Sequence, residues 1–299
     1  MDRFPDLRHF EEGLPACTHP LGVSVAGLTV GFLFPGEAPL EALRERYRPF
    51  LAEEEPALVF RVVPGWEAYL SMAPDRFLRL EERPLGEGRL LLSHGFAAFR
   101  AGRRGVVRVS APPGSPSFLQ AVENVLRWTV ADLALEHRGF VLHSAGLVRE
   151  GRACLFFGPS GAGKSTVASL SPGLPLLSDD LVLLLKRQGR FFAAATPFAG
   201  TLPQGGKHPG IFPVAGLFRL RKAPEDRLEA LPRPVAVASL AAACPFVTAP
   251  ADRKGRLLPL LEDLTGQTPV FDLHFTKSAS FWPLLESEVL HGRTDGPPA

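Results

Sequence analysis

The sequence has few cysteines, few amide side chains and no long apolar run. Its 299 residues include only three cysteines, Cys17, Cys154 and Cys244. An odd number of widely separated thiols indicates neither a disulfide framework nor a zinc cluster. No apolar run approaches the roughly 20 residues that cross a bilayer, and the start Met-Asp-Arg-Phe-Pro-Asp is too polar for a signal peptide. We therefore expect a cytoplasmic protein with no membrane partner.

Excess charge of one sign is also lacking. The 33 basic and 31 acidic residues leave a formal net charge of +2, so no global field favours nucleic acid as a partner. Asn124 is the only asparagine, whereas 30 residues are proline. Scarce amides and proline-rich loops are typical of thermophilic proteins, although a GC-rich genome produces part of the same bias. The apolar fraction of 45% is that of a globular protein.

The strongest motif is a glycine-rich stretch between an apolar run and a helical pattern. Residues 155–166 read Leu-Phe-Phe-Gly-Pro-Ser-Gly-Ala-Gly-Lys-Ser-Thr and fit the phosphate-binding pattern G-x-x-x-x-G-K-[ST] at every fixed position. The run 153–157 predicts a buried strand, and the residues from 164 onward continue as a helix would. A plain glycine-rich turn is the alternative, but it explains neither the fixed positions nor their context.

This pattern predicts ATP as a ligand and Mg²⁺ as its companion ion. Glycines let successive N–H groups turn inward around an anion, and the helix adds its positive end. Lys164 would reach the β- and γ-phosphates, and the hydroxyl of Ser165 would hold Mg²⁺. The candidate nucleotide-binding residues are Gly158, Ser160, Gly161, Ala162, Gly163, Lys164, Ser165 and Thr166.

Two neighbouring acids follow the motif after one short helix. The run 174–185 places Asp179 and Asp180 at the carboxyl end of the next strand, the edge at which open α/β sheets bind ligands. One acid can hold Mg²⁺, and the other can take a proton from an attacking hydroxyl. The alternative is a turn whose Asp side chain caps local amides. His143, in an apolar run just before the motif, reads on its own as a structural residue.

The chain reads as two parts. Residues 1–112 contain no catalytic motif and predict a smaller, β-rich α+β domain, with strands over 22–34 and 58–63 and a helix over 39–51. A proline-rich break over 111–116 precedes a strong helix that Ser115 can cap. We place the second domain at 113–299. Within it, residues 196–210 form a polar, glycine-rich loop that suits acceptor binding, with Lys207 and His208 as groups to test.

The order of these features resembles the kinase domain of HPr kinase/phosphorylase. That family carries a strand with a histidine before its phosphate loop and an Asp-Asp pair after the loop helix, which match His143 and the acids 179–180. The resemblance is good over 117–185 and weak over 186–286. It implies the α/β fold of the HPr kinase/carboxykinase type, an active-site role for His143, a general base at Asp179 and a Mg²⁺ ligand at Asp180.

The remainder of the chain departs from that family. Residues 1–112 do not resemble its usual N-terminal domain, and its acid-bearing, glycine-rich signature is not found between Gly200 and Gly216. The chain is similar instead to a looser group of HPr-kinase-related proteins, some of which act on small peptides. By analogy with such enzymes, a homo-oligomer is one possible state.

Three functions remain open at this point. The first is an ATP- and Mg²⁺-dependent kinase that phosphorylates a Ser or Thr hydroxyl of a protein or peptide, with residues 1–112 recognising the acceptor. The second is a small-molecule kinase of the shikimate or gluconate type, whose acids also lie one strand after such a loop. The third is a nucleotide-binding regulatory module with little catalysis.

Overall fold

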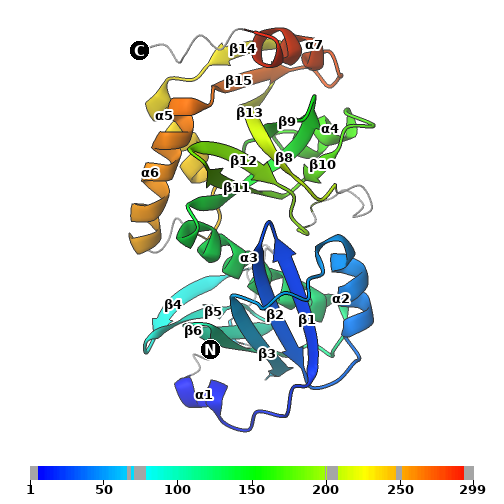
Figure 1. Cartoon of the computed structure of the whole chain (residues 1–299), viewed down its shortest axis with the longest axis vertical. Helices are drawn as coiled ribbons and strands as arrows, with labels where there is room; N and C mark the ends of the chain where they lie inside the picture. Colours follow the sequence, from blue (N-terminus) through cyan, green and yellow to red (C-terminus); the bar gives the residue numbers. More distant parts are fainter. Residues whose placement is uncertain are drawn as a thin grey trace. The chain divides into compact units, whose positions relative to one another are not determined.

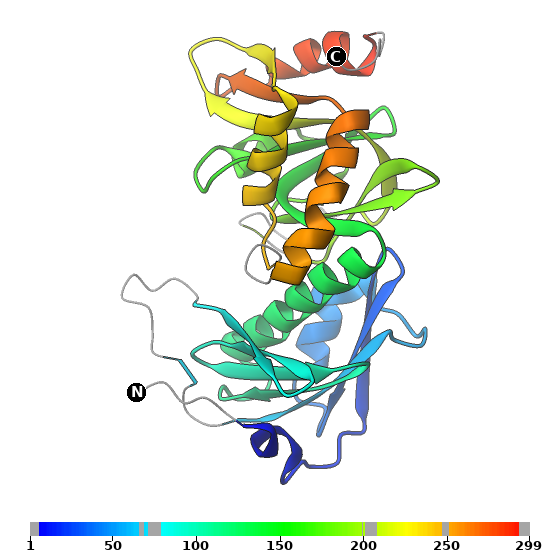
Figure 2. The ribbon, with the colours of Figure 1, turned by 90° about the vertical axis from the view of Figure 1, so that its left-hand side faces the viewer.

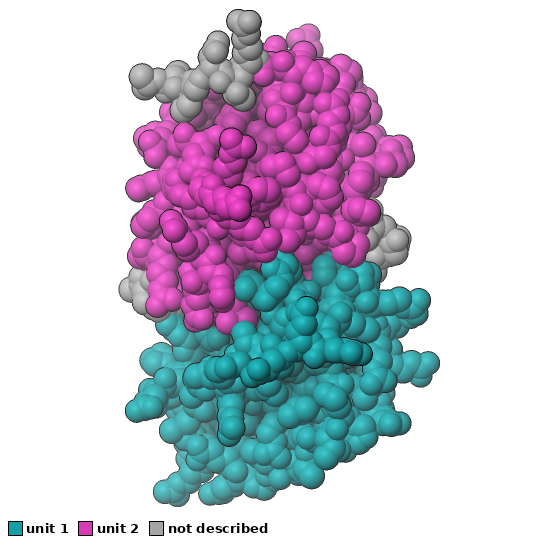
Figure 3. Space-filling model, in the orientation of Figure 1, with its two compact units in different colours: residues 1–130 teal, residues 131–299 magenta. Residues whose placement is uncertain are grey.

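The computed structural model describes residues 6–65, 69–70, 79–198, 200, 208–246 and 251–292. The fold is mixed α/β with two sheets. It divides into two compact units, residues 1–130 and 131–299, which Figure 3 distinguishes by colour. Each is described by itself. Among the described residues, no helix combines the length and apolarity that crossing a membrane requires.

Unit 1 contains a seven-stranded sheet in the order β1-β2-β3-β7-β6-β5-β4. Its strands are β1 (His19–Val25), β2 (Leu28–Phe34), β3 (Leu58–Pro64), β4 (Glu81–Leu85), β5 (Gly88–Leu92), β6 (Phe96–Ala101) and β7 (Arg104–Val109). Three neighbours, β2, β3 and β7, run parallel, and the other pairs are antiparallel. The helices are α1 (Leu7–Glu11), α2 (Leu40–Tyr47) and the 3-10 turn η1 (Arg48–Phe50).

The single strand that we predicted over 22–34 is wrong in detail. The structure divides this run into the hairpin of β1 and β2, which turns at Ala26 and Gly27. Both turn residues have positive φ, +55° and +92°, the conformation that a tight hairpin turn requires. Ala26 pays a steric cost there that a sequence pattern does not reveal.

The long helix α3 (Pro116–Glu136) begins where the sequence predicted it. The amide of Phe118 donates to Ser115 Oγ over 3.4 Å, so Ser115 caps the helix as expected. Trp128 is fully buried, with the guanidinium of Arg100 5.1 Å from its ring centre. The predicted domain boundary at 112/113 lies just before this helix, whereas the two compact units divide inside it, between residues 130 and 131. The boundary at 112/113 stays a prediction.

Unit 2 is built on strands that pair in a closed ring. The strands are β8 (Gly139–Arg149), β9 (Arg152–Phe157), β10 (Leu176–Ser178), β11 (Leu181–Arg187), β12 (Arg190–Ala194), β13 (Ile211–Lys222), β14 (Arg227–Ala230) and β15 (Val270–Phe275). The first half of β8 pairs with β11 and its second half with β9. Strand β13 likewise pairs first with β12 and then with β9, and β11 pairs with β12. The ring therefore runs β8-β11-β12-β13-β9 and back to β8.

Helices cover this sheet. They are α4 (Lys164–Ser169), α5 (Arg233–Ala242), α6 (Ala251–Gln267), α7 (Phe281–Leu285) and the π-helical turn η3 (Glu286–Leu290). Figure 2 shows α5 and α6 side by side, and Figure 1 shows α7 beyond the end of β15. Helices α4 and α7 pack their apolar residues on the sheet face that carries Phe156.

An aromatic cluster fixes the strand that leads into the glycine-rich loop. The ring of Phe156 in β9 stacks on Phe218 in β13 at 5.3 Å and meets Trp282 of α7 edge-on at 5.8 Å. All three side chains are buried, and each contributes about 1.5–3 kcal/mol to stability by leaving water. Cys154 belongs to the same core, as predicted, and burial raises the pKa of its thiol to about 12. The loop therefore starts from a rigid strand.

Candidate active site

The glycine-rich loop occupies residues 158–163, between the end of β9 and the start of α4. This is the strand–loop–helix context that the motif requires. Three of its glycines have positive φ: Gly158 at +151°, Gly161 at +76° and Gly163 at +117°. Residues with a Cβ rarely adopt these angles. The loop backbone therefore depends on glycine at the positions that the motif fixes.

Space as well as backbone angle requires glycine at two of these positions. A Cβ on Gly163 would lie 2.6 Å from Cζ of Phe275, and one on Gly158 would lie 3.0 Å from the Cβ of Ala162. The loop is thus closely packed underneath, while Ser160 and Gly161 at its tip are exposed. An exposed, glycine-dependent loop at a helix start suits a phosphate group.

Lys164 is folded over this loop. Its side chain is only 8% exposed, and Nζ donates to the carbonyl oxygens of Gly158 at 2.9 Å and Pro159 at 3.2 Å. Burial lowers the pKa of Lys164, and the negative charge of Asp180 partly opposes that shift. The ammonium group therefore lies at the loop and within electrostatic reach of Asp180. Ser165 and Thr166 follow in the first turn of α4 and are half-buried.

The register of three strands brings the other candidates to the same place. In the β8–β9 pair, Ser144 lies opposite Phe157, the last residue before the loop. In the β8–β11 pair, His143 lies opposite Leu181, directly after the two acids. The amide of Ser144 also donates to the carbonyl oxygen of Asp180 over 3.0 Å. The point where β8 changes partners thus carries His143, the start of the loop and the acid turn.

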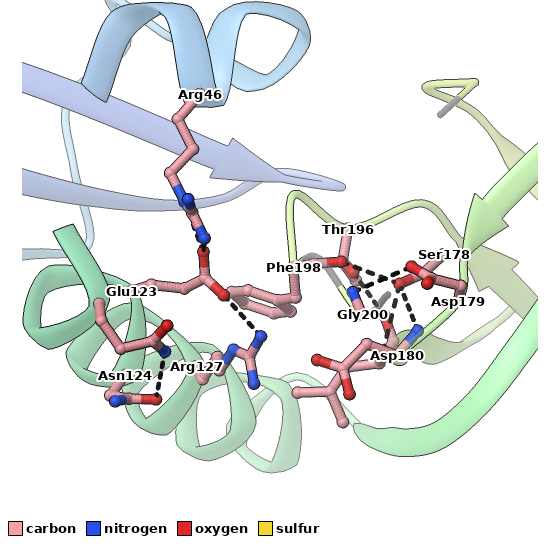
Figure 4. Close-up of polar contacts among 12 residues, drawn as sticks. Arg46, Glu123, Asn124, Arg127, Ser178, Asp179, Asp180, Thr196, Phe198 and Gly200 are labelled. Carbon is pink, nitrogen blue, oxygen red and sulfur yellow. Dashed lines mark hydrogen bonds and ion pairs between the residues drawn. The ribbon is translucent and has the colours of Figure 1, made fainter. Parts of the chain in front are cut away.

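The two acids lie in a turn between β10 and β11 that Ser178 organises. Its Oγ accepts the amides of Asp180 and Leu181, both at 3.2 Å, and donates to the carbonyl oxygen of Phe198 over 3.2 Å. Figure 4 shows these bonds on one side of the turn. The predicted place of the acids, at the carboxyl end of a short strand, is confirmed, because they directly follow β10 and precede β11.

The two carboxylates have different surroundings. Asp179 is 3% exposed, and its Oδ1 accepts the amide of Gly200 at 3.0 Å. Asp180 Oδ1 lies 3.6 Å from Nε2 of His143, whose side chain is 43% exposed. The structure thus brings Asp180 and His143 together, and it places the carboxylate of Asp179 against Gly200 (Figure 4).

Two further candidates, Lys207 and His208, come from the polar loop over 196–210. His208 lies beside β10. The amide of His208 donates to the carbonyl oxygen of Leu176 in β10 over 2.8 Å, and its ring lies 6.3 Å from that of Phe212. Lys207 lies outside the described residues. The roles that the sequence analysis assigned to individual site residues stay predictions.

A hydrogen-bond network that the residue pattern did not predict supports the acid turn. Ser178, Thr196 and Gly200 all bond to it, and Thr196 Oγ1 donates to the carbonyl oxygen of Leu181. A serine directly before two acids is a signal for a turn stabilised by the serine side chain. The role of Ser178 could therefore have been predicted from the sequence. The roles of Thr196 and Gly200 could not have been predicted in this way. These two residues reach the turn only because β11 pairs with β12.

A second polar cluster lies at the carboxyl ends of β13 and β15. Arg219, opposite Phe157 in the register, donates through Nε and Nη2 to the two oxygens of Asp272 at 2.6 and 2.7 Å. Glu229 and His274 lie near Asp272 at distances that would suit a metal ion. However, Arg227 Nε already donates to Glu229 over 2.9 Å. Because guanidinium groups donate hydrogen bonds to the carboxylates of both Asp272 and Glu229, we interpret the cluster as a set of ion pairs and assign no metal to it.

Comparison with known proteins gives a matching family and structural likenesses. The family model described as SynChlorMet cassette protein ScmC matches residues 118–291, more than half of the chain. No curated protein matches. Among solved structures, the HPr(Ser) kinase/phosphatase from Coxiella burnetii is 19% identical, with a TM-score of 0.24 over 30% of this chain and 72% of that chain. A likeness at that TM-score does not establish a shared fold.

Proposed function

We propose that this chain, which belongs to the SynChlorMet cassette protein ScmC family, is an ATP- and Mg²⁺-dependent phosphotransferase, because its glycine-rich loop and its acid turn adjoin the same strand, β8. Its acceptor is a Ser or Thr hydroxyl of a protein or peptide. Residues 113–299 form a P-loop kinase domain of the HPr kinase/carboxykinase type, and residues 1–112 recognise the acceptor. The observation that supports this proposal most is that His143, Asp180 and the start of the glycine-rich loop come together where β8 changes partners.

The residues present fit a nucleotide and its metal ion. The loop 158–163 offers backbone amides in a conformation that glycine alone adopts easily, Lys164 supplies a positive charge, and Ser165 supplies a hydroxyl at the helix start. When bound, Mg²⁺ would neutralise charge on the phosphate oxygens. Ser165 and an acid of the 179–180 pair would hold it.

The reaction would be a direct transfer. The acceptor hydroxyl oxygen forms a bond to the γ-phosphorus, the bond from that phosphorus to the bridging oxygen of ADP breaks, and the hydroxyl proton passes to a carboxylate of the acid turn. Lys164 and the loop amides stabilise the negative charge that develops on the phosphoryl oxygens. The protein contributes position and charge, and no covalent intermediate is needed.

The test is transfer from γ-labelled ATP by the purified full-length chain. Labelled phosphate is expected on Ser or Thr of a peptide acceptor, only with Mg²⁺ and not with Lys164→Ala. Peptides from the proteins encoded beside this chain are the first acceptors to use. Strong turnover of one metabolite hydroxyl would instead favour the small-molecule kinase. Tight ATP binding without any turnover would favour the regulatory module.

A further inference from the structure

Asp179 and Asp180 are adjacent in sequence but make contacts of different kinds. The carboxylate of Asp179 is 3% exposed and bonds to a backbone amide 21 residues downstream, that of Gly200 at 3.0 Å. Space beside Gly200 is also tight, since a Cβ on Gly200 would lie 2.5 Å from Oδ2 of Asp179. Figure 4 shows the carboxylate of Asp179 directed at Gly200.

Asp180 faces the groups expected to meet the phosphates. Its Oδ1 lies 3.6 Å from His143 Nε2, and its side chain is 16% exposed. Its backbone is held independently, because its carbonyl oxygen accepts the amide of Ser144 and its amide donates to Ser178 Oγ. The carboxylate of Asp180 is therefore aimed by bonds that do not involve Asp179.

We propose that Asp179 is a positioning residue that holds Gly200 on the acid turn, and that Asp180 is the acid of the pair that meets the reacting phosphoryl group. This inference rests on the proposed phosphotransfer. It differs from the role that the family resemblance implies, in which Asp179 takes the proton. A carboxylate that is buried and engaged with a backbone amide is poorly placed to receive a proton from an incoming hydroxyl.

Two described residues just before Gly200 are also tied to the acid turn. Thr196 bonds to both flanking strands, through its amide to Leu177 and through its hydroxyl to Leu181. The carbonyl oxygen of Phe198 accepts from Ser178 Oγ. The amide of Gly200 adds a bond to the carboxylate of Asp179 itself. Holding Gly200 at the acid turn is a positioning task.

The two roles separate in a set of four variants. Asp179→Asn keeps an oxygen that can accept the Gly200 amide, but its side chain cannot act as a base. Asp179→Ala removes the hydrogen bond to the Gly200 amide, and Gly200→Ala adds a Cβ that would clash with the Asp179 carboxylate. Asp180→Asn removes the acid that faces His143. The readouts are phosphate release from Mg²⁺·ATP, with water standing in for the acceptor hydroxyl, and hydrogen exchange at the Gly200 amide.

We expect Asp179→Asn to keep activity within a factor of about ten, because a charge-assisted bond is only roughly twice as strong as a neutral one. We expect Asp180→Asn to lose about 10²–10⁴-fold, the usual contribution of a general acid or base. Asp179→Ala and Gly200→Ala should both lose activity, and exchange at residue 200 should accelerate in Asp179→Ala but stay slow in Asp179→Asn.

The inference is overturned if Asp179→Asn is as inactive as Asp179→Ala while exchange at residue 200 stays slow in the asparagine variant. That result would make Asp179 the base. If the wild-type chain neither binds nor hydrolyses Mg²⁺·ATP, the proposed function fails. Exchange then still decides the positioning role, because an unchanged Gly200 amide in Asp179→Ala would contradict it.

Discussion

Gly163 lies directly against the ring of Phe275. A Cβ at Gly163 would stand 2.6 Å from Cζ of that ring, which closes off the space beneath the last glycine of the loop. The same residue has φ of +117° and caps the N-terminus of α4. One glycine thus combines a left-handed backbone, a helix start and contact with a core aromatic ring.

Gly163→Ala is expected to lower the free energy of unfolding by about 1–3 kcal/mol, the usual cost of a strained backbone position, and to weaken nucleotide binding. Urea denaturation and titration with a fluorescent ATP analogue measure the two effects. Gly161→Ala is the matched control, because its φ is +76° but the added Cβ meets open space. Equal effects of the two variants would show that the contact with Phe275 is unimportant.

Lys164→Met should separate activity from stability. Lys164 is 8% exposed, and burial lowers the pKa of its ammonium group, so removing the charge relieves a desolvation cost. Loss of the two bonds to loop carbonyls offsets this gain, and we expect unfolding free energy within about 1 kcal/mol of the wild type. Phosphate release from Mg²⁺·ATP should fall by about 10²-fold or more.

An assay of phosphate release from Mg²⁺·ATP and chemical denaturation of the same samples check this pair of outcomes. Lys164→Arg is the control, since it keeps a positive charge but changes its shape. If Lys164→Met released phosphate at the wild-type rate, Lys164 would have no role in the proposed reaction.

The ion pair of Asp272 with Arg219 should make stability depend on pH in the acid range. Burial disfavours the charged carboxylate, but the hydrogen bonds and charge of Arg219, aided by Arg221, outweigh it and hold the pKa of Asp272 below its usual range. The unfolded state protonates this group near its ordinary pKa of about 3.9. Its contribution is therefore complete above that pKa and is lost as the pH falls through the lower folded-state pKa.

Urea denaturation between about pH 3 and pH 7 tests this linkage. The difference in unfolding free energy between the wild type and Asp272→Asn should be large at neutral pH and should shrink below about pH 4. Glu53→Gln, which alters an exposed carboxylate, provides the control. A difference that stays constant across the whole range would show that the ionisation of Asp272 is not linked to folding.

Glu123 in unit 1 is expected to be a strong determinant of stability. Its side chain is 1% exposed. One oxygen accepts from Arg46 Nε at 2.6 Å, and the other accepts from Arg127 Nη2 at 2.5 Å (Figure 4). Because both arginines would lose their counter-charge, Glu123→Ala should destabilise the chain by about 3–5 kcal/mol.

A double-mutant cycle with Arg46→Met measures the coupling between Glu123 and Arg46 in this network. The double variant should be less destabilised than the sum of the two single variants, since either single change already removes the interaction between Glu123 and Arg46. Simple additivity would mean that these two groups do not interact in solution.

Helix α6 illustrates where sequence patterns fail. The helical period of apolar residues is recognisable in the sequence only over 256–264. The structure extends the helix over 251–267. Arg253 in its first turn is 1% exposed, and it donates to Asp132 over 2.7 Å and to the carbonyl oxygen of Phe246 over 2.8 Å. Asp132 is far from Arg253 in the sequence, and Phe246 lies before the helix begins. The local sequence pattern therefore does not predict these contacts.

Other elements were predictable because local signals and tertiary packing agree. The strand over 270–275 matches β15, and the capped helix after Ser115 matches α3. The strand, loop and short helix around residues 153–171 also match, since β9 and α4 lie where the phosphate-binding pattern requires them. In each case the apolar period and the end signals pointed to the same element.

The sequence by itself determined the glycine-rich loop and its strand–loop–helix context, because glycine at fixed positions and the strand before it are local properties that need no partner. It also determined that two acids follow within one supersecondary step. Only the tertiary structure decided which of those acids faces His143 and Lys164. That choice depends on the registers of β8 with β9 and β11 and on the bond from Gly200 to Asp179, and such long-range pairings have no signature in the residues around them.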